Sequence, residues 1–188
     1  MAENTALETR SLVRIALFAA LIGVLGLVPP VYLPMAAGVP VTAQSMAVML
    51  AGLVLGGRNG ALAVALFLLV VALGAPLLSG GRGGLGVFFG PTAGFALGFI
   101  PAALVTGWLA QRLPWPRLAA NLVAAMVGGI GVLYLCGVPA LAAIAHISLT
   151  KALLGSLAFV PGDMLKAVLA ALAARTVQDS GALGNSRR

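Results

Sequence analysis

An acid and a base lie one helical turn apart in the run PGDMLK at residues 161–166. A spacing of three residues places the side chains of Asp163 and Lys166 on one face of a helix, and Pro161 is favoured in a helix's first turn. The pair could line a polar pocket, where Lys166 meets an anionic ligand group and Asp163 accepts hydrogen bonds from ligand N–H groups. Alternatively, Asp163 caps the helix and Lys166 extends into the nearest water.

Arg82 supplies a second cation, within a segment that holds seven glycines from Gly74 to Gly90 and no acid. Glycine lets the backbone adopt unusual dihedral angles and approach a ligand closely. We therefore interpret this segment as a lid or pocket wall, with a flexible surface loop as the alternative. It does not match the phosphate-binding pattern G-x-x-x-x-G-K-[ST].

Thr42 and Gln44 lie at the start of an expected helix, which they could cap, or they could hydrogen-bond a neutral ligand group. Phe88, Phe89 and Phe95 are interpreted as packing or interface aromatics rather than a stacking site for a ligand. The candidate substrate-binding residues are Asp163, Lys166, Arg82, Gln44 and Thr42.

Catalytic and metal chemistry have few candidate residues. The chain has one histidine, His146, and one cysteine, Cys136, so we expect neither a transition-metal site nor an intramolecular disulfide. We interpret His146 as structural or interfacial. Only Asp163 and His146 could serve as a general base away from the termini, so we do not expect an enzyme and predict no cofactor.

The composition indicates that the solvent of this chain is lipid. Hydrophobic residues make up 61% of the 188 residues and charged residues 8%, against about 25% charged in soluble domains. No charged residue occurs at 15–57, 59–81, 83–111 or 118–150, and a spanning helix needs roughly 20 apolar residues. The net charge of +7 comes without a dense basic run, so we do not expect a nucleic-acid partner.

We predict an all-α membrane protein, a bundle of six transmembrane helices with a short surface helix between the fifth and the sixth. The domain organisation expected is a cytoplasmic segment at 1–10, a substrate-binding transmembrane domain at 11–177 and a disordered tail at 178–188. Residues 140–157 are too polar in the middle for a span and should form one or two short helices along the membrane surface. The expected spans are 11–28, 41–55, 61–73, 91–113, 118–136 and 161–177.

An even number of spans places both termini on one side of the membrane. That side collects eight basic residues, and the other side collects only Arg82, Lys151 and Lys166, so we predict cytoplasmic termini. Residues 15–28 could instead be a cleaved signal, but Glu3 and Glu8 occupy the place of its basic region. We expect a retained first helix.

Ala16 and Ala20 in the first helix form a small-xxx-small pair. Such a pair lets another helix approach closely in lipid. It could serve internal packing or the docking of a partner subunit.

Several motifs together resemble the BioY family, the biotin-binding S components of energy-coupling-factor (ECF) transporters. They are VPVTAQ at 39–44, GGRGGLGVFFGPT at 80–92, Gly-Phe pairs at 94–95 and 98–99, and PGDMLK at 161–166. The resemblance covers about 11–177. The chain departs from the family's usual pattern at Ala43, which could alter pocket volume, and mildly at Ala93.

The resemblance implies a six-helix bundle in the bacterial inner membrane that binds biotin near its outer face, as transported substrate. It implies that Asp163 and Lys166 contact biotin, with Arg82 a candidate for the same site. It also implies that Ala16 and Ala20 dock on a transmembrane coupling (T) subunit, which works with ATP-binding subunits. The chain itself carries no nucleotide-binding motif.

Biotin offers an apolar bicycle, a ureido group and a carboxylate, which suits an apolar pocket with few polar groups. The hypothesis is that Lys166 and Arg82 hold the carboxylate while Asp163 accepts from the ureido N–H groups, with reversed roles as the alternative. Two other functions stay open at this point. One is a stand-alone secondary transporter of a small carboxylate vitamin, in which Asp163 could couple transport to protons. The other is a small membrane enzyme.

Overall fold

The computed structural model describes residues 2–32 and 40–180, and side chains at 8–30 and 42–180. Val39 of the first family motif and residues 181–188 of the expected tail lie outside the described residues. Two short strands, β1 (Val31–Tyr32) and β2 (Pro40–Val41), pair antiparallel. The helices are α1 (Ala2–Gly26), α2 (Gln44–Leu55), α3 (Gly57–Ala72), α4 (Ala93–Arg112), α5 (Arg117–Met126), α6 (Leu133–Ile144), α7 (Leu149–Leu157) and α8 (Val160–Asp179), with a 3-10 turn η1 (Leu85–Phe88) and a π-helical segment η2 (Val127–Val132).

The two ends of the chain are more helical than we predicted. Helix α1 begins at Ala2, so most of the expected cytoplasmic segment at 1–10 extends the first helix. Helix α8 continues to Asp179, which removes the first residues from the expected disordered tail. Asp179, at the end of this helix, forms ion pairs with Arg117 and Arg175.

The fifth predicted span, 118–136, is too short. Residues 117–144 form one long apolar helix from α5, η2 and α6. Proline inside a helix usually breaks it, yet α6 continues past Pro139. The π-helical segment contains Gly128, and a methyl group there would overlap the Thr106 hydroxyl of α4. Glycine thus lets this span lie directly against α4.

Small residues bring the central helices together. Without a hydrophobic drive between helices in lipid, association depends on close packing. Gly107 of α4 lies against the α2–α3 junction, where an added methyl group would meet backbone atoms of Gly52, Gly56 and Gly57. Phe67 of α3 is fully buried in a hydrophobic core cluster of the bundle.

The helices are long and apolar enough for several membrane crossings. Residues Glu8–Gly26, Ala93–Arg112 and Arg117–Ile144 each qualify as a span, and α7 with α8 form a fourth candidate bent by 53°. Helices α2 and α3 are apolar but shorter. The all-helical membrane class is therefore confirmed, and a helix (α7) does occur between the fifth and sixth expected spans. The count of six spans and the surface position of α7 stay predictions.

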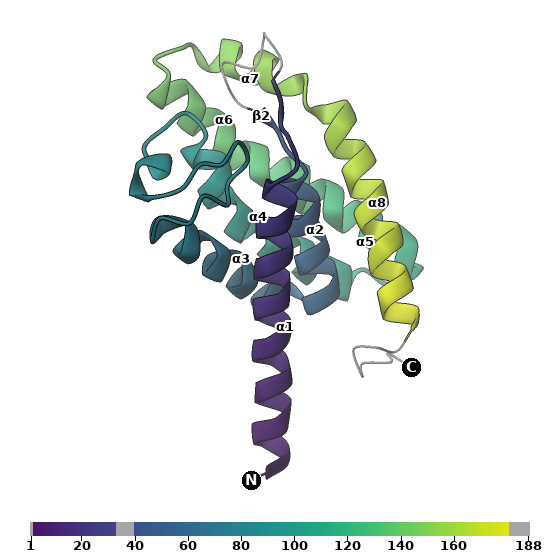
Figure 1. The fold of residues 1–188 in the computed structure, drawn as a ribbon. Helices are drawn as coiled ribbons and strands as arrows, with labels where there is room; N and C mark the ends of the chain where they lie inside the picture. Colours follow the sequence, from purple (N-terminus) through teal and green to yellow (C-terminus); the bar gives the residue numbers. More distant parts are fainter. Residues whose placement is uncertain (1, 33–39, 181–188) are drawn as a thin grey trace.

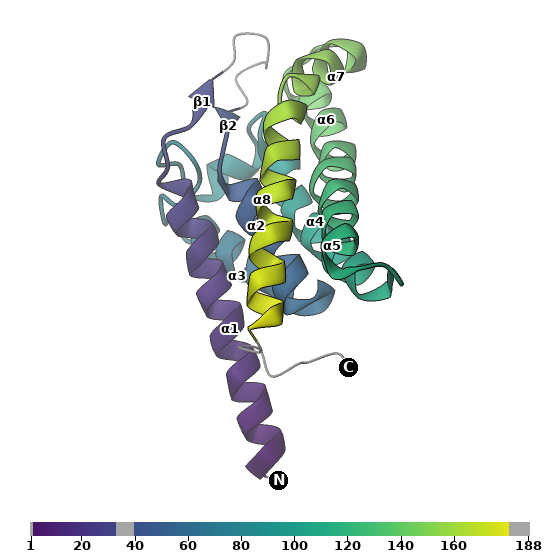
Figure 2. The same cartoon turned by 90° about the vertical axis from the view of Figure 1, so that its right-hand side faces the viewer.

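The bundle has two distinct ends. Helix α1 begins and helix α8 ends at the lower end in Figures 1 and 2, while β1, β2 and α7 lie at the upper end. The first residues of α2 and α8 therefore face the upper end, together with the connection between α3 and α4. This is where the predicted site residues come from.

Candidate functional site

One cavity at the upper end is lined by all five predicted substrate-binding residues. Thr42 and Gln44 enter it from the start of α2, Arg82 from the α3–α4 connection, and Asp163 and Lys166 from the first turns of α8. Its empty space is about 630 Å³, counting the part open to the exterior. Residues that are far apart in the sequence thus line one cavity of the size of a small-molecule binding site.

Asp163 and Lys166 form an ion pair, with 2.8 Å between Nζ and Oδ1. Asp163 is 5% exposed, and the Lys166 side chain stays within the site instead of extending into water. The cap position of α8 belongs to Phe159, so Asp163 is not a capping residue. The pocket interpretation of the pair fits this geometry, and the capping alternative does not.

Tyr134 and Ser45 complete the surroundings of the carboxylate. The Tyr134 hydroxyl donates to Asp163 Oδ2 at 2.6 Å, and Ser45 Oγ donates to Oδ1 at 3.5 Å. Lys166 Nζ also donates to Ser45 Oγ at 3.2 Å. The sequence reasoning missed both residues. A signal existed, since Tyr134 is a rare polar aromatic within an apolar span and Ser45 directly follows Gln44.

Arg82 owes its position to a tight turn. Leu78 and Arg82 pair as a short antiparallel bridge, and Gly80 and Gly81 between them adopt φ of 81° and 70°, a region that side chains disfavour. The guanidinium folds back over this turn, where Nε donates to Ser79 O at 3.1 Å and Nη1 to Thr92 Oγ1 at 3.0 Å. The glycine-rich segment is therefore a pocket wall.

No ion pair involves Arg82 among the described residues. It therefore differs from Lys166, whose charge is balanced by Asp163. The cavity has one neutral pole, at the start of α8, and one cationic pole, in the α3–α4 connection.

Gln44 holds the wall of the cavity together. Its side-chain amide donates to Ile22 O at 3.1 Å and Leu77 O at 3.0 Å, and accepts from Ser79 N at 3.0 Å. The cap position of α2 is Ala43, without a side-chain cap, so the capping alternative for Gln44 and Thr42 does not hold. Direct ligand contact by either residue stays a prediction.

The apolar part of the cavity combines aromatic and aliphatic side chains. Phe95, Phe99 and Phe159 line it, and the Phe95 ring meets Tyr134 edge to face, with centroids 6.1 Å apart. Phe95 thus belongs to the cavity as well as to the packing. Phe88 packs on the core and Phe89 is exposed, as expected for packing and interface aromatics.

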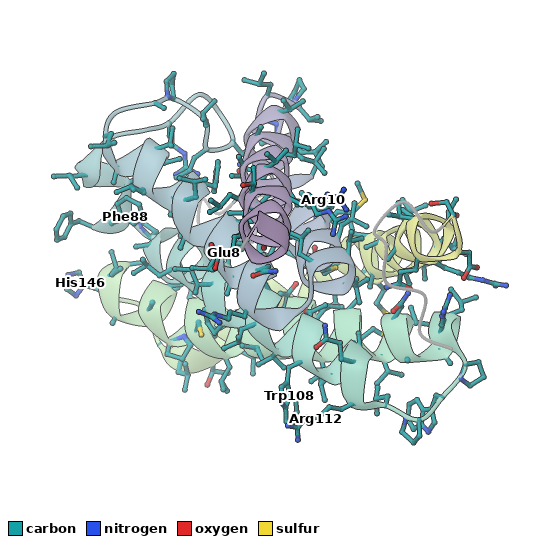
Figure 3. The ribbon with its side chains drawn as sticks, turned by 90° about the horizontal axis from the view of Figure 1, so that it is seen from below. Glu8, Arg10, Phe88, Trp108, Arg112 and His146 are labelled. Carbon is teal, nitrogen blue, oxygen red and sulfur yellow. The ribbon has the colours of Figure 1, made fainter. Side chains whose placement is uncertain are left out.

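His146 is exposed and lies at the edge of the molecule in Figure 3, in the turn after α6. Within 2–32 and 40–180, no group of three or more His, Cys, Asp or Glu side chains could hold a metal ion. On α1, Ala16 and Ala20 are exposed while Ala19 is buried. The pair does not serve packing inside this chain, and docking of a partner there stays a prediction.

A helical membrane protein with a cavity that is mostly apolar, one buried acid and two cations is built to bind a small polar molecule. The chain belongs to the BioY family, whose model matches residues 1–182. The resemblance seen in the sequence motifs is thereby confirmed.

Curated relatives cover nearly the whole chain. A biotin transporter BioY of Rhizobium etli is 53% identical over 177 residues, 91% of this chain and 94% of the relative. A biotin transporter BioY of Rhodobacter capsulatus is 47% identical over 178 residues, 89% of this chain and 93% of the relative. These relatives are transporters rather than enzymes, which argues against the enzyme alternative.

The fold also matches a solved structure, a crystal structure of the S-component for biotin from an ECF-type ABC transporter. The TM-score is 0.87 at 28% identity, and the match covers 93% of both chains. The helical arrangement described above is therefore that of a transporter S component.

Proposed function

We propose that this chain is the biotin-binding membrane subunit, or S component, of an ECF-type vitamin uptake transporter. One observation carries the proposal: residues from α2, the α3–α4 connection and α8 converge on one cavity that combines a buried acid, two cations and an aromatic wall. Biotin has matching parts, namely an apolar bicycle, a neutral ureido group and a carboxylate. The names of the relatives agree with this ligand.

We assign the two poles of the cavity to the two polar ends of biotin. The neutral pole suits the neutral ureido group, because Asp163 can accept from its N–H groups and the third N–H of Lys166 can donate to its oxygen. The cationic pole suits the carboxylate, because Arg82 has no acidic partner among the described residues. This revises the sequence hypothesis that Lys166 and Arg82 share the carboxylate, since Lys166 already neutralises Asp163.

Native mass spectrometry of the purified protein tests the ligand directly. We expect a copurified adduct of the mass of biotin, which is displaced by added excess of a labelled biotin. The Lys166→Ala and Asp163→Asn variants should lose the adduct, because each removes part of the neutral pole. An adduct of different mass, or equal adduct in both variants, would reject this assignment of ligand and pole.

We further propose six crossings of a bacterial inner membrane, with the beginning of α1 and the end of α8 on the cytoplasmic side. Helices α2 and α3, with 12 and 16 residues, extend about 18 and 24 Å, less than a hydrocarbon core of roughly 30 Å. At the end opposite the cavity Arg112 lies 4.6 Å above the Trp108 ring (Figure 3), a pair suited to the cytoplasmic interface.

The partners proposed are a transmembrane coupling subunit and ATP-binding subunits. The exposed Ala16 and Ala20 of α1 form the docking surface in this proposal, since small side chains let a partner helix come close. A coexpressed coupling subunit should copurify with this chain and be lost from the Ala16→Trp Ala20→Trp variant. Persistence of the complex in that variant would place the docking surface elsewhere.

A further inference from the structure

The hydroxyl of Ser79 is a buried polar group on a residue that lines the cavity. Ser79 is 1% exposed, and its Oγ has no partner among the described residues. A buried hydroxyl left unpaired is costly, so each such group in a native structure needs a physical reason. Thr106 and Ser156 carry the same kind of hydroxyl, but only Ser79 lines the cavity.

The backbone of Ser79 is held firmly on both sides. Its N–H donates to Gln44 Oε1 at 3.0 Å, and its carbonyl accepts from Arg82 Nε at 3.1 Å. Ser79 is therefore fixed within the same tight turn as Arg82, whose guanidinium forms no ion pair with any described residue. A hydroxyl donor beside a cation is an arrangement that suits a carboxylate, whose two oxygens accept charge-assisted hydrogen bonds.

We infer, on the basis of the proposed function, that Ser79 is a specificity-determining residue whose hydroxyl donates to the carboxylate of the bound vitamin beside Arg82. Ligand binding then gives this hydroxyl an acceptor that no described residue supplies. The cationic pole is the nearer destination for this hydroxyl, because Ser79 and Arg82 belong to the same tight turn.

The test compares two ligands on the Ser79→Ala variant: biotin, and biotinol, in which an alcohol replaces the carboxylate. We expect the variant to bind biotin at least about tenfold more weakly than the wild type, the usual effect of losing a hydrogen bond to a charged group. Its affinity for biotinol should change less than about twofold. Ser156→Ala is the matched control, because it removes an unpaired buried hydroxyl outside the cavity, and should leave both affinities unchanged.

A second readout separates ligand contact from a structural role. The ligand-free Ser79→Ala protein should melt at the wild-type temperature or above it, since the substitution removes an unsatisfied buried group. A lower melting temperature with equal loss of both ligands would overturn the inference in favour of a structural role. If Ser79→Ala binds biotin with wild-type affinity, the role of Ser79 is overturned and the proposed function stands. If the wild type binds no biotin, both the role of Ser79 and the proposed function are overturned.

Discussion

The buried ion pair offers the sharpest test of how this cavity is built. Lys166 Nζ lies 2.8 Å from Asp163 Oδ1, and the two side chains are only 15% and 7% exposed. The substitution Lys166→Met keeps most of the side-chain volume and removes the charge. It leaves the Asp163 carboxylate buried, with the hydroxyl groups of Tyr134 and Ser45 as its remaining side-chain donors in the described part of the chain.

The expected cost follows from the burial of the carboxylate. Removing one partner of a buried ion pair destabilises a protein by about 3–5 kcal/mol. We expect the lower end, about 3 kcal/mol, because the pair borders an open cavity and keeps two hydroxyl donors. For a chain of this length that corresponds to a fall of about 6–12 °C in melting temperature. The double variant Asp163→Asn Lys166→Met removes both charges and should recover most of this loss.

Thermal unfolding of the detergent-purified, ligand-free proteins measures these differences. The matched control is Arg175→Met, which breaks an exposed pair with Asp179 at 3.4 Å and should cost less than about 1 kcal/mol. If Lys166→Met melts with the wild type, or if the double variant is as unstable as the single one, the buried pair does not have the energetic role assigned to it.

Three further substitutions have definite expected results. Gly128→Ala should lower the melting temperature by several degrees, because its methyl group would overlap the Thr106 hydroxyl. Gly131→Ala in the same segment is the control and should be tolerated, because its methyl group would meet only Met126 O, at 4.0 Å. Equal melting temperatures of the two variants would contradict this packing. Tyr134→Phe should cost about 1.5–3 kcal/mol, the range for a hydrogen bond to a charged group, and weaken biotin binding through Asp163; unchanged unfolding and binding would argue against this bond. Arg82→Gln should weaken biotin binding by at least about tenfold and leave biotinol binding nearly unchanged; equal losses for both ligands would remove the carboxylate from Arg82.

The sequence predicted the site better than it predicted the ends of the helices. Charged residues in lipid are costly and therefore informative, which is why Asp163, Lys166 and Arg82 stood out and do line one cavity. The long connection around Arg82 could be interpreted as a wall because it is rich in glycine, and four of its glycines (Gly74, Gly80, Gly81 and Gly84) do adopt positive φ. Charged residues in lipid and clustered glycines are thus easy to recognise in a sequence, because each has a free-energy cost that needs a reason.

Side-chain contacts between helices were harder to predict from the sequence. Tyr134 lies inside the predicted fifth span, 118–136, yet the sequence did not indicate that its hydroxyl donates to Asp163 of α8. The pairing of Lys166 with Asp163 was likewise open, since spacing alone places two side chains on one face without stating whether they meet each other or a ligand. Only the packed arrangement distinguishes these cases.

The central claim is that a cavity near one end of a lipid-embedded bundle binds a small anionic vitamin between a neutral pole and a cationic pole. Equilibrium binding of biotin to the purified wild type and to Asp163→Asn and Lys166→Ala, each verified as folded, measures this most directly. We predict saturable one-site binding in the wild type and a loss of affinity well beyond about twofold in each variant. Affinities within about twofold of the wild type in both variants would contradict the account.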